Sequence, residues 1–369
     1  MKKLCIIYNF AQRYREGIFK LIDKEYDCHW YFGINNTDIE GLDTTVLRNV
    51  STLKNKTVIK DPIYYQENAV KLIFNKTYSD YLILGDTFCL STWLLALIAK
   101  LFFHNKHVYF WSHGWYGKES SLIAKLKRIY FNLPDGVFLY GNYAKKLMTD
   151  AGFNPNKLYV IHNSLNYSEQ IKLRNQLSPT NCFSKHFCND NLNIIFIGRL
   201  TKVKKINLLI EAIKTLKERN KSINLTLIGD GEMRKELETL TKRYQLNSNI
   251  WFYGKCYDDA INSELIYNAD LCVSPGNVGL TSIHSMMFGT PVISHNCFKY
   301  QMPEFEAIKP GITGDYFEYE DSLSLADTIE RWFKMHSDDR DTVRENCYRE
   351  IDSSWTPEFQ ISILKNVIK

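Results

Sequence analysis

The stretch Ile195-Phe-Ile-Gly-Arg-Leu-Thr-Lys-Val-Lys-Lys-Ile206 decides the fold of the second half of the chain. Its apolar start predicts a buried strand over 193–197, and the apolar period of 206–218 predicts a helix. A strand, a short basic loop and a helix begin a βαβ unit. The loop brings Arg199 and Lys204 together at the end of the strand. A diphosphate fits such a pair of cations, although a solvated basic turn accounts for the same residues equally well.

The same alternation of strands and helices continues in both directions from this loop. Downstream, strands are expected over 224–228, 250–253, 271–274 and 291–294, and helices over 232–244, 258–268 and 281–288. In the first half, strands are expected over 3–8, 29–32, 81–84, 107–111, 136–140 and 157–161, and helices over 14–23, 91–101, 119–131 and 143–151. This alternation predicts parallel sheets with crossover helices.

Two domains follow from this pattern and from the length of 369 residues. The segment 164–191 is polar and lacks periodicity, so it is expected to connect an α/β domain at 1–163 to a second one at 192–350. We therefore predict an α/β protein with two Rossmann-like doubly wound domains. Ligands of such sheets bind beyond the carboxyl ends of the strands, and a central cleft that both domains face is where we expect them.

Composition and charge exclude several classes of protein. A formal charge of +5 is too weak for a nucleic-acid binder, but it suits an anionic substrate or a membrane surface. Nine scattered cysteines without a CxxC pair indicate reduced thiols rather than disulfides or a metal site. The N-terminus lacks a signal-peptide core, and the apolar segment 90–103 is too short for a membrane span. A cytoplasmic protein is expected.

A second loop resembles an anion cradle. In Ser274-Pro-Gly-Asn-Val-Gly-Leu-Thr-Ser-Ile-His284, Gly276 and Gly279 allow backbone amides to approach a ligand closely. The helix that starts near Leu280 directs its positive end to the same place. Thr281 and Ser282 could donate hydroxyl hydrogen bonds there, and capping of the helix is an equally good role for them.

Several short motifs follow one another in the second half. They are Gly198-Arg-Leu with Lys204, Leu227-Ile-Gly-Asp-Gly231, Phe252-Tyr-Gly254, Tyr267-Asn-Ala-Asp270, Ser274-Pro275, Gly289-Thr-Pro-Val292, Pro303-Glu304 and Gly311-Ile-Thr-Gly314. In order and spacing they resemble the retaining glycosyltransferases of family 4 (glycosyl transferases group 1), which have the GT-B architecture. The resemblance covers roughly 193–335.

This resemblance implies a metal-independent transfer of a hexosyl or N-acetylhexosaminyl group with retention of configuration. A nucleotide diphosphate sugar, with UDP favoured, would be the donor, and no cofactor is implied. Arg199 and Lys204 would neutralise the diphosphate together with Gly279, Leu280 and Thr281. The nucleoside would lie near Gly254 and Lys255.

The same resemblance implies the setting and one further packing contact. The acceptor would be a glycan or a lipid-linked glycan, in the synthesis of capsule, lipopolysaccharide or another surface polysaccharide. A helix within 351–369 would return to the N-terminal domain.

The sequence departs from the family at two positions. Members of the family usually carry two glutamates around this helix, and the matching residues here are Gly276 and His284. His284 could still bond a ribose hydroxyl, or it could be a satisfied core histidine. Contacts with the donor sugar are then expected from Gly276, Asn277 and Val278.

The first half offers candidate residues for the acceptor and for catalysis. Family members have a histidine in the cleft at the position of His113, which directly follows a predicted strand, although a turn residue is the alternative. Arg13, Tyr14 and Arg15 follow the first strand and are expected to contact an acceptor phosphate, unless they are merely solvated.

The helix predicted over 119–131 combines apolar residues at helical spacing with basic ones. This pattern fits a helix on a membrane surface that holds a lipid-linked acceptor, and a helix packed on its own domain gives the same pattern.

Two other functions compete with sugar transfer. A nicotinamide enzyme fits poorly because no GxGxxG follows the first strand. A nucleotide-sugar-binding subunit that lost catalysis with its glutamates stays open.

Overall fold

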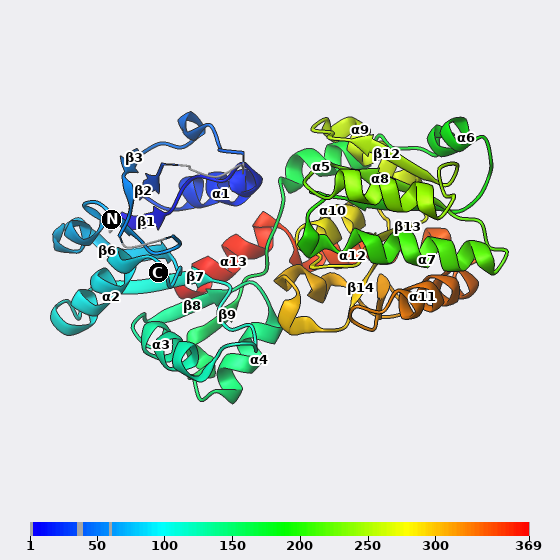
Figure 1. Cartoon of the computed structure of the whole chain (residues 1–369). Coiled ribbons are helices and arrows are strands. Elements are labelled where there is room, and N and C mark those ends of the chain that lie inside the picture. Colours follow the sequence, from blue (N-terminus) through cyan, green and yellow to red (C-terminus); the bar gives the residue numbers. More distant parts are fainter. Residues whose placement is uncertain (1–2, 35–39, 59–60, 369) are drawn as a thin grey trace. The chain divides into compact units, whose positions relative to one another are not determined.

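The computed structural model describes residues 3–34, 40–58 and 61–368 (Figure 1). The chain forms two compact units. Unit 1 comprises Met1–Tyr167 and Thr356–Lys369, and unit 2 comprises Ser168–Trp355.

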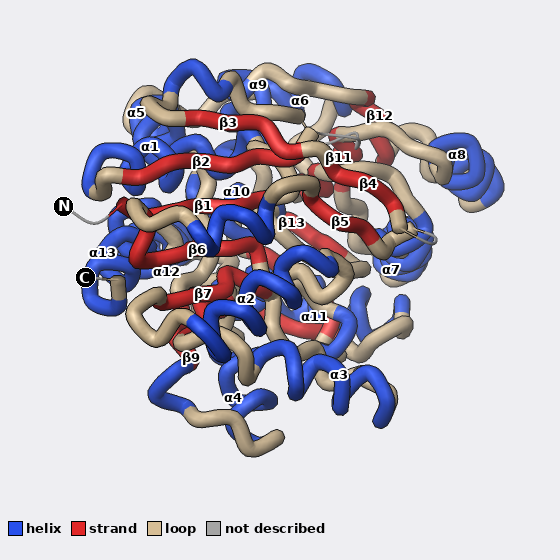
Figure 2. The backbone as a smooth tube through the Cα atoms, turned by 90° about the vertical axis from the view of Figure 1, so that its left-hand side faces the viewer, coloured by secondary structure: helices blue, strands red, loops and turns tan. Residues whose placement is uncertain are grey.

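Unit 1 contains a parallel sheet of seven strands in the order β3-β2-β1-β6-β7-β8-β9. The strands are β1 (Lys3–Tyr8), β2 (Cys28–Gly33), β3 (Val50–Leu53), β6 (Tyr78–Leu84), β7 (His107–Ser112), β8 (Gly136–Leu139) and β9 (Leu158–Val160). Figure 2 shows β3, β2, β1, β6 and β7 side by side. The direction in which strands are added reverses at β1, so the gap between β1 and β6 is the switch point where doubly wound sheets bind ligands.

Helices cover both faces of this sheet because side chains on successive strand residues point to opposite faces. They are α1 (Glu16–Glu25), α2 (Leu90–Phe102), α3 (Ser121–Phe131), α4 (Asn142–Asp150) and α13 (Pro357–Val367). On β1, Cys5 and Ile7 join the core beneath α2, whereas Leu4 and Ile6 join the core beneath α1 and α13. Helix α13 packs against α1, so the end of the chain completes unit 1.

Unit 2 repeats the doubly wound plan with six parallel strands in the order β12-β11-β10-β13-β14-β15. The strands are β10 (Asn193–Ile197), β11 (Asn224–Ile228), β12 (Ile250–Gly254), β13 (Leu271–Ser274), β14 (Val292–His295) and β15 (Gly314–Phe317). The helices are α7 (Ile206–Glu218), α8 (Arg234–Arg243), α9 (Asp259–Asn268), α10 (Thr281–Met287), α11 (Ser322–Met335) and α12 (Arg340–Ser354). The switch point lies between β10 and β13.

The α/β fold with two Rossmann-like units is confirmed. The segment 164–191, expected to be irregular, contains helices α5 (Tyr167–Arg174) and α6 (Cys182–Phe187). In α6, Phe183 is buried and His186 stacks on Trp251, and in α5, Arg174 forms two hydrogen bonds of 3.0 and 2.9 Å with Asp352. Helices of six to eight residues with so few buried side chains leave no hydrophobic period in the sequence.

None of the helices within residues 3–34, 40–58 and 61–368 combines the length and the apolar character that a membrane crossing requires.

Candidate functional site

Two loops meet at the switch point of unit 2. The first follows β10 and the second follows β13, and both leave the carboxyl edge of the sheet. The ammonium group of Lys204 in the first loop donates to the carbonyl oxygen of Asn277 in the second at 2.6 Å. Across the same junction, the hydroxyl of Thr281 donates to the carbonyl oxygen of Ile197 at 3.1 Å. The structure thus joins the two segments that the sequence singled out.

Gly276 lies where the two loops approach most closely. A Cβ atom on this residue would lie 2.0 Å from the carbonyl oxygen of Val203 and 2.7 Å from the Cα of Lys204. No side chain fits there, so the family's glutamate could not occupy this position. The Cα of Gly276 thus faces the backbone of the first loop, and its predicted contact with a donor sugar stays a prediction.

Arg199 and Lys204 form a cationic pair at this edge. Arg199 is exposed, and its side chain makes no hydrogen bond or ion pair with any residue that the structure describes. Burial lowers the pKa of Lys204 to about 8; the charge of Arg199 also lowers it, while the carboxylate of Glu304 opposes both. Glu304 itself is buried. The site therefore offers more positive than negative charge to a ligand.

The hydroxyl groups next to this pair are already engaged. Besides the bond from Thr281 to Ile197, Ser282 donates to the carbonyl oxygens of Gly279 at 3.1 Å and Glu304 at 2.8 Å. Helix α10 has no side-chain cap at Leu280. Both hydroxyls therefore have partners within the protein and neither caps the helix, and the predicted contact of Thr281 with a diphosphate stays a prediction. The amides of Gly279 and Leu280 donate to no residue in the described part of the chain, and they remain available.

Asn277 and Val278 have different surroundings although they are neighbours. The amide of Val278 donates to the side-chain oxygen of Gln301 at 2.9 Å, and Val278 is fully buried. The predicted contact of Val278 with a donor sugar stays a prediction. The side-chain oxygen of Asn277 is buried and accepts no hydrogen bond within the described residues. Asn277 can therefore accept a hydrogen bond from a ligand hydroxyl.

Gln301 is a residue that the sequence did not reveal. Its amide group also donates to the Ser294 hydroxyl at 2.8 Å and to the His295 carbonyl oxygen at 2.9 Å. It thereby ties the loop after β13 to β14. No motif contains Gln301, and its partner Val278 lies 23 positions away in the chain.

The residues expected near a nucleoside lie at the carboxyl edge of the unit 2 sheet or in helix α10. Gly254 ends β12 and accepts a hydrogen bond from the amide of Gly229 at 2.8 Å, while Lys255 is exposed. His284 lies in α10 with its ring edge against Phe288, and burial lowers its pKa to about 4. His284 is thus neutral at pH 7, which suits either of its two predicted roles.

Unit 1 has a cavity of 680 Å³ at the carboxyl edge of its own sheet. Asn9 after β1, Gly85 after β6, His113 after β7 and Tyr140 after β8 line it. The cavity therefore begins at the switch point between β1 and β6, where the topology predicts a ligand.

His113 lies with its ring against Tyr140, and the ring centroids are 4.7 Å apart. Burial, together with the charges of Arg15 and Lys127, lowers its pKa to about 4. Its buried Nδ1 atom bonds no other described residue. A neutral imidazole with an unused nitrogen can exchange a hydrogen bond with a molecule in the cavity.

Of the three residues expected to contact an acceptor, two line the cavity. Tyr14 and Arg15 do so, and Arg15 is buried among aromatic rings with a hydrogen bond to the Tyr140 hydroxyl. Arg13 is not part of the lining; it is exposed and forms an ion pair with Glu40. The short turn Arg13–Arg15 directs the side chain of Arg13 to solvent, and its predicted contact with an acceptor stays a prediction.

Lys127 is a cavity residue that the sequence analysis placed only on a basic helix face. Its ammonium group donates to Glu119 at 2.8 Å and to the carbonyl oxygen of Gly114 at 3.1 Å. The Glu119 carboxylate accepts the amides of Tyr116 and Gly117. This network fixes the loop that follows His113.

Comparisons with known proteins agree with this reading of the fold and of unit 2. Residues 180–350 match the family model Glycosyl transferases group 1. The match covers most of unit 2, so unit 2 is similar in sequence to this family.

Two curated relatives match part of the chain. An uncharacterized 41.2 kDa protein in the cps region of Klebsiella pneumoniae is 26% identical over 56% of this chain and 54% of its own length. The putative glycosyltransferase EpsD of Bacillus subtilis is 29% identical over 40% of this chain and 38% of its own length. The chain thus spans about half, or less, of the curated relatives it matches.

A solved structure matches the chain almost throughout. The crystal structure of HepE from Anabaena in complex with UDP has a TM-score of 0.71 and 17% identity, covering 100% of this chain and 99% of that one. At this identity the likeness concerns the fold, and it confirms the GT-B fold class that the sequence resemblance predicted.

Proposed function

We propose that the protein is a glycosyltransferase that takes a sugar from a UDP-sugar and transfers it to a glycan or a lipid-linked glycan. Among the described residues, the observation that carries this proposal is the pair Arg199 and Lys204 at the switch point of unit 2. Arg199 can bind two phosphate oxygens at once, and Lys204 adds a second charge beside it. The matched family and the UDP complex of a protein with the same fold support this donor.

The finer features of the reaction are part of the proposal. A hexosyl or N-acetylhexosaminyl group is transferred with retention of configuration. Arg199 and Lys204 supply the positive charge that stabilises the departing diphosphate, so that no metal is required. The amides of Gly279 and Leu280 add donors to the diphosphate, and Asn277 accepts from a sugar hydroxyl. Gly254, Lys255 and His284 contact the nucleoside.

Unit 1 binds the acceptor in this proposal. Its cavity combines apolar walls with Tyr14, Arg15 and His113, a mixture typical of small-molecule sites. The relative in the cps region of Klebsiella pneumoniae supports a reaction in the synthesis of capsule, lipopolysaccharide or another surface polysaccharide. We propose a cytoplasmic protein that contacts the inner face of the membrane through 119–131.

The direct test is release of UDP from a panel of UDP-sugars by the purified chain, with a polysaccharide or lipid extract as the acceptor. Turnover of one donor that requires the extract supports a transferase. Saturable binding of UDP-sugars without turnover under any of these conditions would favour a binding subunit. This alternative is supported by the lack of room for a glutamate side chain at Gly276.

Binding of UDP is expected to weaken as the pH rises. Lys204 has a lowered pKa of about 8, so it loses its charge between pH 7 and pH 9, and the diphosphate binds the charged form. The dissociation constant measured by calorimetry should increase by about tenfold at pH 9, since each pH unit above the pKa costs about 1.4 kcal/mol. Lys204→Arg keeps its charge and should lose the dependence; if it does not, Lys204 is not the titrating group.

Replacing His113 by alanine is expected to lower turnover by about 10²-fold and to leave the affinity for UDP unchanged. His113 lines the cavity of unit 1, whereas the proposed donor groups belong to unit 2. Loss of a positioned proton-exchanging group costs turnover on this scale. His186→Ala, which alters an imidazole stacked on Trp251 far along the chain, is the matched control. A His113→Ala variant that changes only UDP binding would contradict the assignment.

A further inference from the structure

Two helices of unit 1 expose apolar side chains to an unusual degree. Leu90, Leu94, Leu97, Leu101 and Phe102 of α2, and Leu122, Ile123, Leu126 and Ile129 of α3, are all exposed, with Leu122 at 68% and Phe102 at 71%. Single exposed apolar residues need no explanation, but a gathering of nine on two helices does. Only Tyr130 and Phe131 anchor α3 in the core, so packing on its own domain does not account for the apolar stripe of α3.

The two helices form one surface. Trp93 of α2 packs on Tyr130 of α3 with ring centroids 4.7 Å apart, and Lys100 of α2 donates to the carbonyl oxygen of Asn132 directly after α3 at 2.5 Å. Figure 2 shows both helices on the side that faces the viewer. We call the exposed side of α2 and α3 the α2–α3 face.

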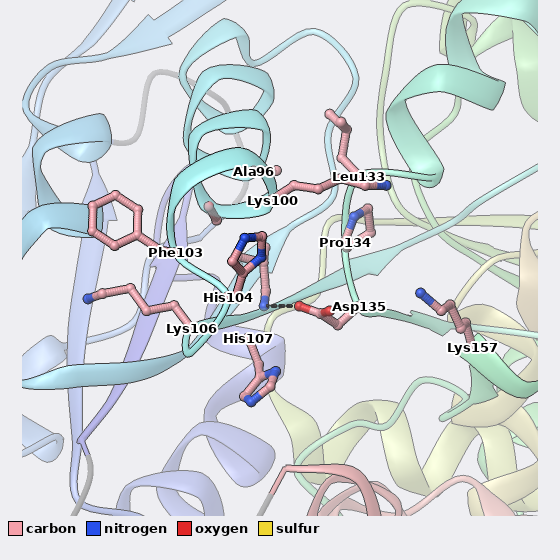
Figure 3. A pocket seen from close by; sticks show the side chains of 12 residues that line it. Ala96, Lys100, Phe103, His104, Lys106, His107, Leu133, Pro134, Asp135 and Lys157 are labelled. Atoms are coloured by element: carbon pink, nitrogen blue, oxygen red, sulfur yellow. Dashed lines mark hydrogen bonds between the residues drawn. The ribbon is translucent and has the colours of Figure 1, made fainter.

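The α2–α3 face carries positive charge only. Neither helix contains an aspartate or a glutamate, and Lys100, Lys125 and Arg128 are exposed on them, whereas Lys127 is paired with Glu119. At the end of α2 lies a cavity of 220 Å³ that also has several basic side chains in its lining (Figure 3). Lys100, His104, His107 and Lys157 line it with the single carboxylate of Asp135, which already accepts the amide of Val108 at 2.9 Å. An apolar surface bordered by cations suits an anionic bilayer.

The acceptor cavity opens on the α2–α3 face. Phe88, Leu90, Ile123 and Leu126 line the 680 Å³ cavity and are at the same time exposed. Arg15, His113 and Lys127 lie among its polar lining. A molecule that enters across this apolar rim therefore meets hydrocarbon side chains first and the cations and the imidazole afterwards.

We infer that the α2–α3 face rests on an anionic bilayer and that the cavity of unit 1 takes its acceptor from that bilayer. The acceptor is then an amphiphile whose hydrocarbon chain crosses the rim at Leu90 and Leu126 and whose phosphate or sugar head lies toward Arg15. This inference rests on the proposed function, since it names the acceptor class of the same cavity.

The first experiment measures sedimentation of the full chain with vesicles. The wild type should sediment with vesicles that contain phosphatidylglycerol, remain in solution with pure phosphatidylcholine, and be released by high salt. A double variant, Leu101→Glu with Leu122→Glu, should bind at least tenfold more weakly, because both residues are exposed and neither lines the cavity. Leu323→Glu on α11, 54% exposed, is the matched control and should bind like the wild type.

The second experiment tests the acceptor class by thermal shift with farnesyl phosphate as the probe. Farnesyl phosphate should raise the Tm of the wild type, whereas farnesol or inorganic phosphate alone should not, and Leu126→Glu should abolish the shift. An equal shift from inorganic phosphate would mean that a free anion, and not an amphiphile, is bound.

Three outcomes would overturn the inference. They are a wild type that ignores anionic vesicles, a double variant that binds like Leu323→Glu, and self-association of the wild type that the double variant abolishes, which would make the face a protein interface. Neither experiment requires sugar transfer. If the vesicle and thermal-shift experiments fail while the protein still releases UDP, only the contact with the bilayer is refuted. If they succeed and no UDP is released, only the proposed transferase activity is refuted.

Discussion

Arg199→Ala is expected to lower kcat/KM for sugar transfer by 10²-fold or more and to weaken UDP binding in parallel. The guanidinium is exposed at the switch point, and among described residues it has no protein partner to release. It is therefore free to bind the diphosphate, whose charge grows as the sugar leaves. Loss of one such preorganised donor typically costs about 3 to 4 kcal/mol. UDP release gives the rate, and calorimetry gives the affinity.

The matched control for this change is Lys202→Ala, which removes one exposed positive charge from the same loop. If only the overall potential of the loop mattered, the two variants would lose the same amount of activity. A tenfold or greater difference between them is expected instead, because the planar fork of arginine binds two phosphate oxygens. Retained folding is checked by the far-UV spectrum and the unfolding temperature. Equal losses would remove the specific role of Arg199.

The sheets of the two units could be predicted because their central strands are buried on both faces. Strands such as β1 and β10 appear in the sequence as short apolar runs, and amphipathic helices such as α7 follow them at the expected spacing. The edge strand β3 and the hairpin of β4 (Asn55–Thr57) and β5 (Tyr64–Gln66) were missed. These strands have three or four residues and are half-exposed or polar, so no period of two is visible in them.

The sequence could predict which residues belong to the candidate site, but it could not predict which residues they contact. Arg199 and Lys204 could be found because cations after a buried strand suit a phosphate. That Gln301 uses the amide of Val278, or that the hydroxyl of Thr281 is bound to Ile197, depends on contacts between segments 23 and 84 positions apart. Single-sequence patterns contain no information on such pairs. The sequence indicated the α3 part of the α2–α3 face as one of two alternatives and did not indicate the α2 part, since exposed and buried leucines look alike in a sequence.

Gly276→Glu introduces the carboxylate that the family resemblance implies at this position, and it is nevertheless expected to abolish activity. The Cβ alone would lie 2.0 Å from the carbonyl oxygen of Val203, so the backbone of the first loop must move. Lys204, whose Cα is 2.7 Å from the same Cβ, moves with it and loses its bond to Asn277. Overpacking of this kind costs about 1 to 3 kcal/mol of unfolding free energy, and UDP affinity should fall by at least tenfold.

Gly276→Ala separates the added volume from the added charge. It introduces the same Cβ without a carboxylate, so it should reproduce most of the loss in UDP affinity. Gly311→Ala is the comparison, because its Cβ meets no atom within 4 Å and only its positive φ of 74° is strained. It should lower the unfolding temperature slightly and leave UDP binding unchanged. If Gly276→Glu instead raised turnover above the wild type, the loops would be mobile enough to admit a side chain, and the lost glutamate would be a catalytic defect rather than a consequence of how the two loops pack.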